Sequence, residues 1–370
     1  MQVPVNEPLL DGNEKAYLTR CIETGWISSD GPFVREFEEK FAARVGRRHA
    51  IAVANGSAAL DVAVAALGLQ PGDEVILPTF TIISCVAAVI RSGALPILVD
   101  CNPDTWNMVP EEVARKITPR TRAIMVVHLY GLPVEMGPIL ELARIHGLKI
   151  IEDAAEAHGQ TCQGRPCGSF GEIGTFSFYP NKLITTGEGG MIVVDDDDLA
   201  EKCRSLRNLC FQPARRFVHD ELGWNFRMSN LQAAVGVAQL ERWDEFMARK
   251  RAMGRRYDDL LGDLPAIQLP LREANGAKNL YWVFGLVLRD SAGRDATAVQ
   301  KELAARGIGT RPFFWPMHEQ PVFRRMGLFK DDSHPVAERI ARYGFYLPSG
   351  MALTDEQIVY VAKATREILS

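Results

Sequence analysis

Short apolar runs alternate with amphipathic stretches over the first two thirds of the chain. Apolar runs that end at glycine, proline or polar residues predict buried strands at 49–54, 74–77, 94–99, 123–127 and 148–151. Helical spacing of apolar residues predicts helices at 13–24, 33–45 and 134–146, and an alanine-rich helix follows residues 55–57 up to Leu67. Strands and helices that alternate in this way predict an α/β fold, with a mainly parallel sheet flanked by helices on both faces.

The last third of the chain has a different pattern. Ser229 and Gln232 have the spacing of a capping box and are predicted to begin a long helix toward residue 260. Beyond it we expect strands at 281–288 and 309–313 and helices at 296–305 and 354–368, which form a small α+β domain. We therefore divide the chain into an N-terminal arm (1–30), a large α/β domain (31–245) and a small C-terminal α+β domain (246–370).

Four predicted strands are followed by residues that could contact a ligand: Asn55, Phe80, His128 and Asp153. Ligands of parallel sheets bind beyond the carboxyl ends of the strands, so these positions predict a site. The turn Asn55-Gly56-Ser57 separates a strand from a helix, which directs free backbone N–H groups and the positive helix end toward an anion. Ordinary capping of the helix by Asn55 or Ser57 is the alternative explanation.

Charge and cysteine content exclude several classes of protein. The formal net charge of -4 predicts no nucleic-acid partner. Seven scattered cysteines form no CxxC pair and no zinc pattern, so we expect no metal site and reduced thiols in the cytoplasm. The N-terminus lacks the layout of a signal peptide, and no apolar run approaches the roughly 18 residues of a membrane helix.

The stretch 177–190, SFYPNKLITTGEGG, contains the candidate for covalent chemistry. Lys182 lies between the aromatic-rich residues 176–179 and a glycine-rich loop that we expect to be flexible, and no acidic residue stands within three positions of it. A lysine that loses solvation in such surroundings becomes less basic and can attack an aldehyde. A surface lysine ahead of a loop is the alternative.

Pyridoxal phosphate is the aldehyde cofactor that a lysine holds as a Schiff base, and its binding has three requirements. Its phosphate needs an anion cradle, its pyridine nitrogen needs a carboxylate, and its ring needs an apolar partner. The candidates for these roles are Gly56, Ser57 and Ser177 for the phosphate, Asp153 for the nitrogen, and Phe80 for the ring.

Motifs along nearly the whole chain resemble the DegT/DnrJ/EryC1/StrS family of sugar aminotransferases, which has fold type I of the pyridoxal-phosphate enzymes. These motifs are TGWISS, NGSAAL, GDEVILPTFT, VHLYG, EDAAEAHG, FSFYPNKLITTGEGG, GWNFRMSNLQAA and RPFFWPMH. The resemblance implies that Lys182 holds the cofactor and later moves a proton, and that Asp153 binds the pyridine nitrogen. It places Glu156 near the ring hydroxyl, where much of the family has glutamine.

The resemblance also implies contacts beyond the cofactor ring. Asn225 would reach the phosphate of the neighbouring subunit, so a homodimer with shared active sites is expected. Trp26, Ser28, Arg311 and His318 are the candidates for contacts with the sugar nucleotide. The segment that contains Arg311 and His318 is rich in aromatic residues, and a buried aromatic core is the competing interpretation.

Within the family the likeness is strongest to GDP-perosamine synthases, which aminate GDP-4-keto-6-deoxymannose. The resemblance therefore implies transfer of the amino group of glutamate to C4 of a nucleotide-linked 4-keto-6-deoxyhexose, for surface polysaccharide (lipopolysaccharide O-antigen) or natural-product sugars. Glutamate would leave as 2-oxoglutarate before the sugar reacts. Amination at C3, a UDP- or dTDP-linked sugar, and a non-catalytic regulatory relative are the alternatives. The lysine and the carboxylate argue against the last, because folding requires neither.

Overall fold

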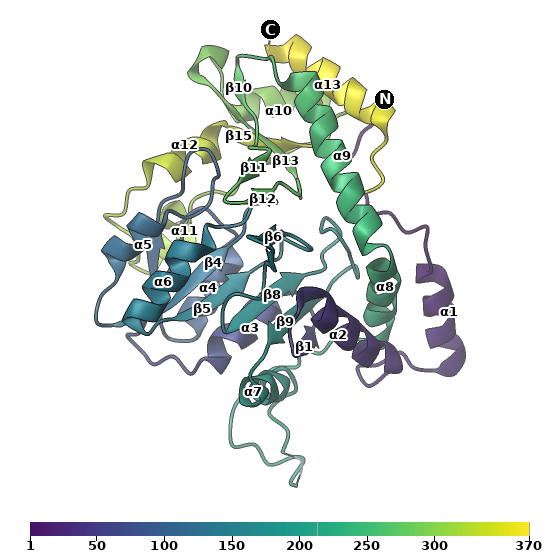
Figure 1. Cartoon of the computed structure of the whole chain (residues 1–370), viewed down its shortest axis with the longest axis vertical. Coiled ribbons are helices and arrows are strands. Elements are labelled where there is room, and N and C mark those ends of the chain that lie inside the picture. The colour runs from purple at the N-terminus through teal and green to yellow at the C-terminus, as the bar shows by residue number, and fades with distance from the viewer. Residues whose placement is uncertain (213, 370) are drawn as a thin grey trace.

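A seven-stranded sheet forms the centre of the structure, a computed structural model that describes residues 1–212 and 214–369 (Figure 1). Its order is β1 (His49–Val53), β9 (Gly190–Val194), β8 (Ile173–Ser177), β5 (Lys149–Asp153), β4 (Thr121–Val127), β2 (Glu74–Pro78) and β3 (Leu95–Val99). Strand β9 is antiparallel to both neighbours, and every other adjacent pair is parallel. The predicted, mainly parallel sheet is confirmed.

Helices cover both faces of this sheet, because its strands carry apolar side chains on both sides. In β1, Ala50 and Ala52 face α2 (Pro32–Val45) and α8 (Asn230–Glu241). Ile51 and Val53 face the opposite way, toward α3 (Gly56–Ala66) and α7 (Asp197–Arg207). At the other end of the sheet the covering helices are α4 (Ile83–Arg91), α5 (Pro110–Lys116) and α6 (Met136–His146).

A second, four-stranded antiparallel sheet lies above the first in Figure 1. Its order is β10 (Ile267–Gln268), β13 (Phe284–Leu288), β15 (Gly344–Leu347) and β14 (Arg311–Pro312). The helices beside it are α9 (Trp243–Leu261), α10 (Ala296–Ala305), α12 (Pro335–Tyr343) and α13 (Asp355–Leu369). The strand predicted at 281–288 begins only at Phe284, because Tyr281 has a φ of 56°, outside the strand region.

Short elements complete the chain. They are β6 (Thr161–Cys162), β7 (Arg165–Pro166), β11 (Glu273–Ala274), β12 (Ala277–Lys278), α11 (Pro321–Arg325) and the 3₁₀ helices Asp290–Ala292 and Met317–Glu319. The last of these 3₁₀ helices follows β14, which is only two residues long where five were predicted.

The predicted capping box is present at the start of α8. Ser229 and Gln232 exchange side-chain and backbone hydrogen bonds there. The predicted long helix is interrupted, however, because Arg242 leaves helical geometry with a φ of -108° and a ψ of 14°. Helices α8 and α9 carry the chain from the first sheet to the second, so the boundary predicted at 245 falls inside α9 and stays a prediction.

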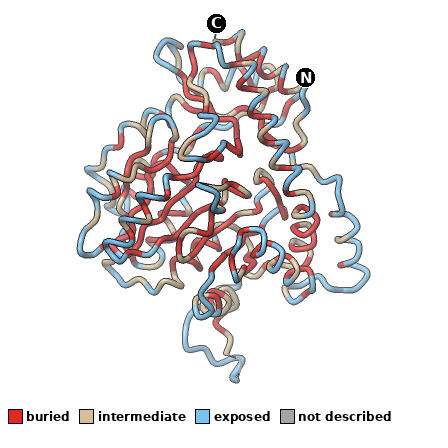
Figure 2. The backbone as a smooth tube through the Cα atoms, viewed as in Figure 1, coloured by how far each residue is buried: buried red, intermediate tan, exposed pale blue. Residues whose placement is uncertain are grey.

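The N-terminal arm touches both parts of the molecule. Val3 forms an isolated bridge with Ile308, and α1 (Glu14–Thr24) lies beside α8, where the Tyr17 hydroxyl donates to Glu241. By contrast, the described residues between α7 and α8 project away from the body (Figure 2). Phe217 and Leu222 among them are exposed. None of the described helices has the length and hydropathy of a membrane-spanning segment.

Candidate functional site

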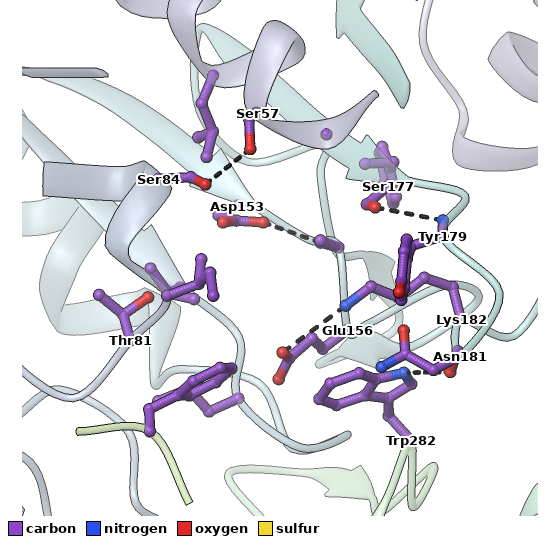
Figure 3. Close-up of a pocket in the computed structure, with 18 of the residues that line it drawn as sticks. Ser57, Thr81, Ser84, Asp153, Glu156, Ser177, Tyr179, Asn181, Lys182 and Trp282 are labelled. Carbon is purple, nitrogen blue, oxygen red and sulfur yellow. Dashed lines mark hydrogen bonds and ion pairs between the residues drawn. The ribbon is translucent and has the colours of Figure 1, made fainter. Parts of the chain in front are cut away.

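A cavity of about 870 Å³ lies between the carboxyl ends of the large sheet and the second sheet. Residues at or just after β1, β2, β5 and β8 line one side, and they include Asn55, Thr81, Asp153 and Ser177. The other side comes from Trp282, from residues 311–315 and from Tyr346. Two of the four residues predicted at strand ends, Asn55 and Asp153, therefore line the cavity, and Figure 3 shows Asp153 there.

Lys182 projects into this cavity from the loop that follows β8. Its side chain is only 10% exposed, and its Nζ lies 3.7 Å from Glu156 Oε1 and 3.9 Å from the centre of the Trp282 ring (Figure 3). Burial lowers the pKa of Lys182, while the charges of Glu156 and Asp153 oppose that shift. The sequence shows no acidic neighbour, but the fold supplies one from 26 positions away in the chain.

Hydrogen bonds hold the loop that contains Lys182, and its expected flexibility stays a prediction. Thr185 donates to the carbonyl of Phe178 over 2.8 Å, and Thr186 donates to that of Glu188 over 2.8 Å. A Cβ on Gly190 would lie 2.4 Å from the Asn55 carbonyl oxygen, so its glycine allows a close backbone approach. The loop holds the lysine in a defined position.

Asp153 ends β5 and is 4% exposed at the edge of the cavity. Its Oδ1 accepts from the backbone N–H of Ala155 over 3.0 Å, and its Oδ2 accepts from the Cys85 thiol over 3.3 Å. Burial raises the pKa of that thiol well above its usual value, so Cys85 remains a donor. These two bonds orient a carboxylate that faces the same cavity as Lys182.

Glu156 is the second buried carboxyl group of the cavity. Its Oε2 accepts from the backbone N–H of Tyr130 over 3.0 Å, which leaves Oε1 toward Lys182. Tyr130 has a φ of 53°, a strained conformation for a bulky residue, and this directs its N–H at the carboxylate. Burial raises the pKa of Glu156 to about 7 against the attraction of Lys182.

Three serines and a glycine surround the end of the cavity at the helix N-termini. Ser57 in the first turn of α3 and Ser84 in the first turn of α4 share a hydrogen bond of 2.7 Å (Figure 3). A Cβ on Gly56 would lie 2.7 Å from Cβ of Ser177, so only glycine lets α3 approach β8 this closely. Asn55 caps α3 from its side chain, as the sequence allowed. Free N–H groups and hydroxyls converge here and suit an anion.

Phe80, predicted to cover a cofactor ring, is not among the cavity-lining residues in the described part of the chain. It is fully buried, with its ring centre 5.8–6.0 Å from those of Tyr130, Phe313 and Phe314. Its apolar ring packs in the core instead, and Ile82, two positions later, lines the cavity.

Two predicted histidines are structural. His128 is fully buried between Glu152 and the backbone N–H of Val134. His318, predicted to contact the sugar nucleotide, is 1% exposed because the 3₁₀ helix Met317–Glu319 turns its ring inward. Its two ring nitrogens bond to Thr79 and Glu338, and neither histidine lines the cavity as the structure describes it.

The remaining predicted residues fall into two groups. Arg311 lines the cavity, as expected. Trp26, Ser28 and Asn225 are exposed. None of the three is among the described residues that line the cavity of their own chain. The backbone carbonyl of Ser28 accepts from Asn230, and the side chain of Asn225 accepts from Arg227.

Trp282 is one of the cavity-lining residues that sequence reasoning missed. Its ring faces Lys182, and its indole N–H donates to the carbonyl of Asn181 over 2.7 Å. It stands just before β13, in a segment predicted only as the start of a strand. A tryptophan in an apolar strand pattern gives no signal of its own, because core packing predicts the same residue.

Comparison with known proteins agrees with this arrangement. Residues 8–366 match the profile of the DegT/DnrJ/EryC1/StrS aminotransferase family. The chain belongs to this family. Its members include the GDP-perosamine synthases of Escherichia coli O157:H7, 41% identical over 100% of this chain and 99% of that protein, and of Caulobacter vibrioides, 44% identical over 100% and 98%.

Solved structures of similar proteins have the same fold. The aminotransferase TlmJ from Streptoalloteichus hindustanus superimposes with a TM-score of 0.92, at 31% identity over 100% of this chain and 99% of that one. S. venezuelae DesV, solved with a ketimine intermediate, gives 0.88 at 37% identity over 96% and 94%. The chain is an aminotransferase of fold type I, as the sequence predicts.

Proposed function

We propose that the protein is a pyridoxal-phosphate-dependent aminotransferase that moves the amino group of glutamate to C4 of GDP-4-keto-6-deoxymannose, giving GDP-perosamine. The observation that carries the chemistry is the convergence of Lys182, Asp153 and Glu156 on one cavity. The names of the relatives from Escherichia coli O157:H7, Caulobacter vibrioides and Vibrio cholerae support the choice of sugar.

The residues of the cavity fit the cofactor that the family implies. Gly56, whose missing Cβ leaves room at the N-terminus of α3, would hold the phosphate together with Ser57 and Ser177. Asp153 is an oriented carboxylate for the pyridine nitrogen, and Lys182 is a buried amine with a lowered pKa. When bound, pyridoxal phosphate supplies an electron sink for the pair released as the amino group moves.

The chain's own groups orient, shield and move protons. Lys182 would act on the aldehyde of the cofactor as a neutral amine and would later carry the proton removed from the substrate carbon. Asp153 would bind the ring nitrogen, and its hydrogen bonds from the Ala155 N–H and the Cys85 thiol hold the carboxylate in one orientation. Trp282 and the segment 311–315 close the cavity from the small domain and limit water around Lys182.

The sugar assignment is tested by feeding keto sugars to the purified protein. With glutamate, we expect GDP-4-keto-6-deoxymannose to yield an amine at C4, together with one 2-oxoglutarate for each amine. Two relatives favour a second candidate, since a Streptomyces venezuelae dTDP-3-amino-3,4,6-trideoxy-alpha-D-glucose transaminase and an Acidithiobacillus ferrooxidans UDP-N-acetyl-3-dehydro-alpha-D-glucosamine 3-aminotransferase are each 39% identical. Faster turnover of a UDP- or dTDP-linked 3-keto sugar would replace the first assignment by amination at C3.

We also propose a cytoplasmic homodimer in which Asn225 completes the partner's phosphate site. The exposure of Asn225, in the segment that leads into α8, supports this role. The seven free, buried cysteines suit a reducing compartment. Mixing Lys182→Ala with Asn225→Ala subunits tests the dimer, because a hybrid has one site with both native residues. Recovered activity is expected, and none after verified subunit exchange would contradict shared sites.

A further inference from the structure

Lys182 has a carboxyl partner whose two oxygens have different tasks. Glu156 Oε2 is fixed by the backbone N–H of Tyr130, whereas Oε1 lies 3.7 Å from Lys182 Nζ in the cavity (Figure 3). Asp153 also faces the cavity, but both of its oxygens accept hydrogen bonds, from Ala155 and Cys85. Glu156 therefore has the oxygen that is best placed to exchange a proton with the amine.

Burial brings the proton affinities of the two groups together. It raises the pKa of Glu156 to about 7 and lowers that of Lys182, because both groups lose water. The other titratable groups around the pair are Asp153 on β5, Cys85 on α4, His158, Tyr130 and Tyr346 on β15. Burial raises the pKa of both tyrosines and of the thiol and lowers that of His158 to about 3, so these groups stay neutral near pH 7.

We propose that Glu156 is the proton partner of Lys182 and makes the lysine a neutral amine without proton exchange with solvent. The N–H bond breaks at Lys182 Nζ as an O–H bond forms at Glu156 Oε1, which converts an ion pair into two neutral groups and leaves the net charge of the site unchanged. The reverse transfer restores the ion pair. This inference rests on the proposed function, in which Lys182 must be neutral to attack and to accept a substrate proton.

The geometry allows this transfer after a small movement. Proton transfer needs heavy atoms about 2.6–3.2 Å apart, and catalytic hydrogen bonds are often longer before substrates bind. Lys182 has four rotatable side-chain bonds, while Glu156 is anchored through its other oxygen. The lysine is therefore the group that closes the 3.7 Å distance.

The test uses the cofactor-free protein and the pH dependence of amine labelling. Trinitrobenzenesulfonate reacts with neutral amines, and mass spectrometry of the Lys182 peptide gives its rate from about pH 5.5 to about pH 10. Two groups that share a proton titrate in two steps that belong to the pair. We expect a two-step profile for the wild type, with a substantial rate already after the lower step.

Two matched glutamate variants decide the interpretation. Glu156→Gln removes the carboxylate, so we expect a single step, with full labelling reached about one pH unit or more below the upper step of the wild type. Glu188→Gln alters another cavity-lining glutamate and should leave both steps in place. Circular dichroism of each variant confirms that it is folded.

Two results would overturn the proposal. A single high step in the wild type would show an ordinary ion pair, in which the proton stays on the lysine. An unchanged profile in Glu156→Gln would show that the carboxylate does not govern the amine. Because neither cofactor nor sugar is present, both results are independent of whether the enzyme aminates the proposed substrate.

Discussion

Two buried lysines contact Trp282 in different surroundings, one at its indole ring and the other at its backbone carbonyl. Lys182 Nζ faces the indole ring from the cavity, 3.9 Å from its centre. Lys250, on α9, is 2% exposed and donates to the Trp282 carbonyl over 2.7 Å and to the Ser349 carbonyl. Burial lowers the pKa of both, and to about 7 for Lys250.

The difference lies in the partners of the two amines. Lys182 faces a carboxyl group that can take its proton and a cavity that can admit a substrate. Lys250 faces two carbonyl oxygens, which accept hydrogen bonds and cannot be protonated near neutral pH, and it does not line the cavity in the described residues. Burial alone therefore does not make a lysine reactive, and the neighbours decide between catalysis and structure.

Replacing each lysine by methionine should give the largest difference in turnover between the two sites. Lys182→Met removes the nucleophile and proton carrier, so we expect turnover to fall by more than about 10³-fold. Lys250→Met should lower it by at most about tenfold, through the position of Trp282. Release of 2-oxoglutarate from glutamate measures both. Equal losses in two folded variants would remove the distinction.

Lys250 should make its own pH-dependent contribution to the stability of the protein. Its pKa is lowered from 10.5 to about 7 on folding, so above about pH 7 the unfolded chain binds a proton there that the folded chain has released. Stability then rises with pH by up to about 1.4 kcal/mol per unit, and below pH 7 this contribution is constant.

Urea unfolding of wild type and Lys250→Met from about pH 6 to about pH 9 isolates this contribution, because other groups cancel in the difference. The difference between the two unfolding free energies should be flat below about pH 7 and should grow in favour of the wild type above it. Parallel curves would mean that the amine keeps its proton inside the fold.

Much of the site's large-domain side could be predicted from the sequence. The ends of β1 and β5 follow from apolar runs, and the strand-end rule then brings Asn55 and Asp153 to one edge. Lys182 follows from its unusual local surroundings. In physical terms these predictions rely on short-range patterns and on the topology of a parallel sheet.

The rest depends on contacts between distant segments. Phe80 is predicted to cover the cofactor ring because it follows a strand end, and the family resemblance implies a sugar-nucleotide contact for His318. Neither argument gives the direction of the side chain. Both face the core. Trp282 and the ion pair of Lys182 with Glu156 exist only once the two sheets and the loop after β8 have been placed.

Substitutions of Trp282 should lower kcat less than those of Lys182. Two different substitutions distinguish the contribution of the ring from that of the indole N–H. Trp282→Leu removes the aromatic face and the bond to Asn181, so we expect kcat to fall about tenfold. Trp282→Phe keeps a face and loses only the N–H, so about threefold is expected. Trp315→Leu, at a cavity-lining tryptophan that is 45% exposed and lies under Arg342, is the control for general repacking. A similar loss in that control would assign the effect to cavity shape.

Cys85 should show the smallest effect, because a thiol is a weak donor. It donates to Asp153 over 3.3 Å and lies 3.4 Å from the Thr81 hydroxyl. Cys85→Ala removes one of two hydrogen bonds to the carboxylate, so we expect cofactor affinity to fall about two- to tenfold, while Cys85→Ser should restore it. The thiol of Cys203 on α7 is also fully buried, so Cys203→Ala controls for the lost volume. If Cys85→Ser behaved like Cys85→Ala, the thiol would be acting through packing, and Asp153 would be oriented by its bond to Ala155 alone.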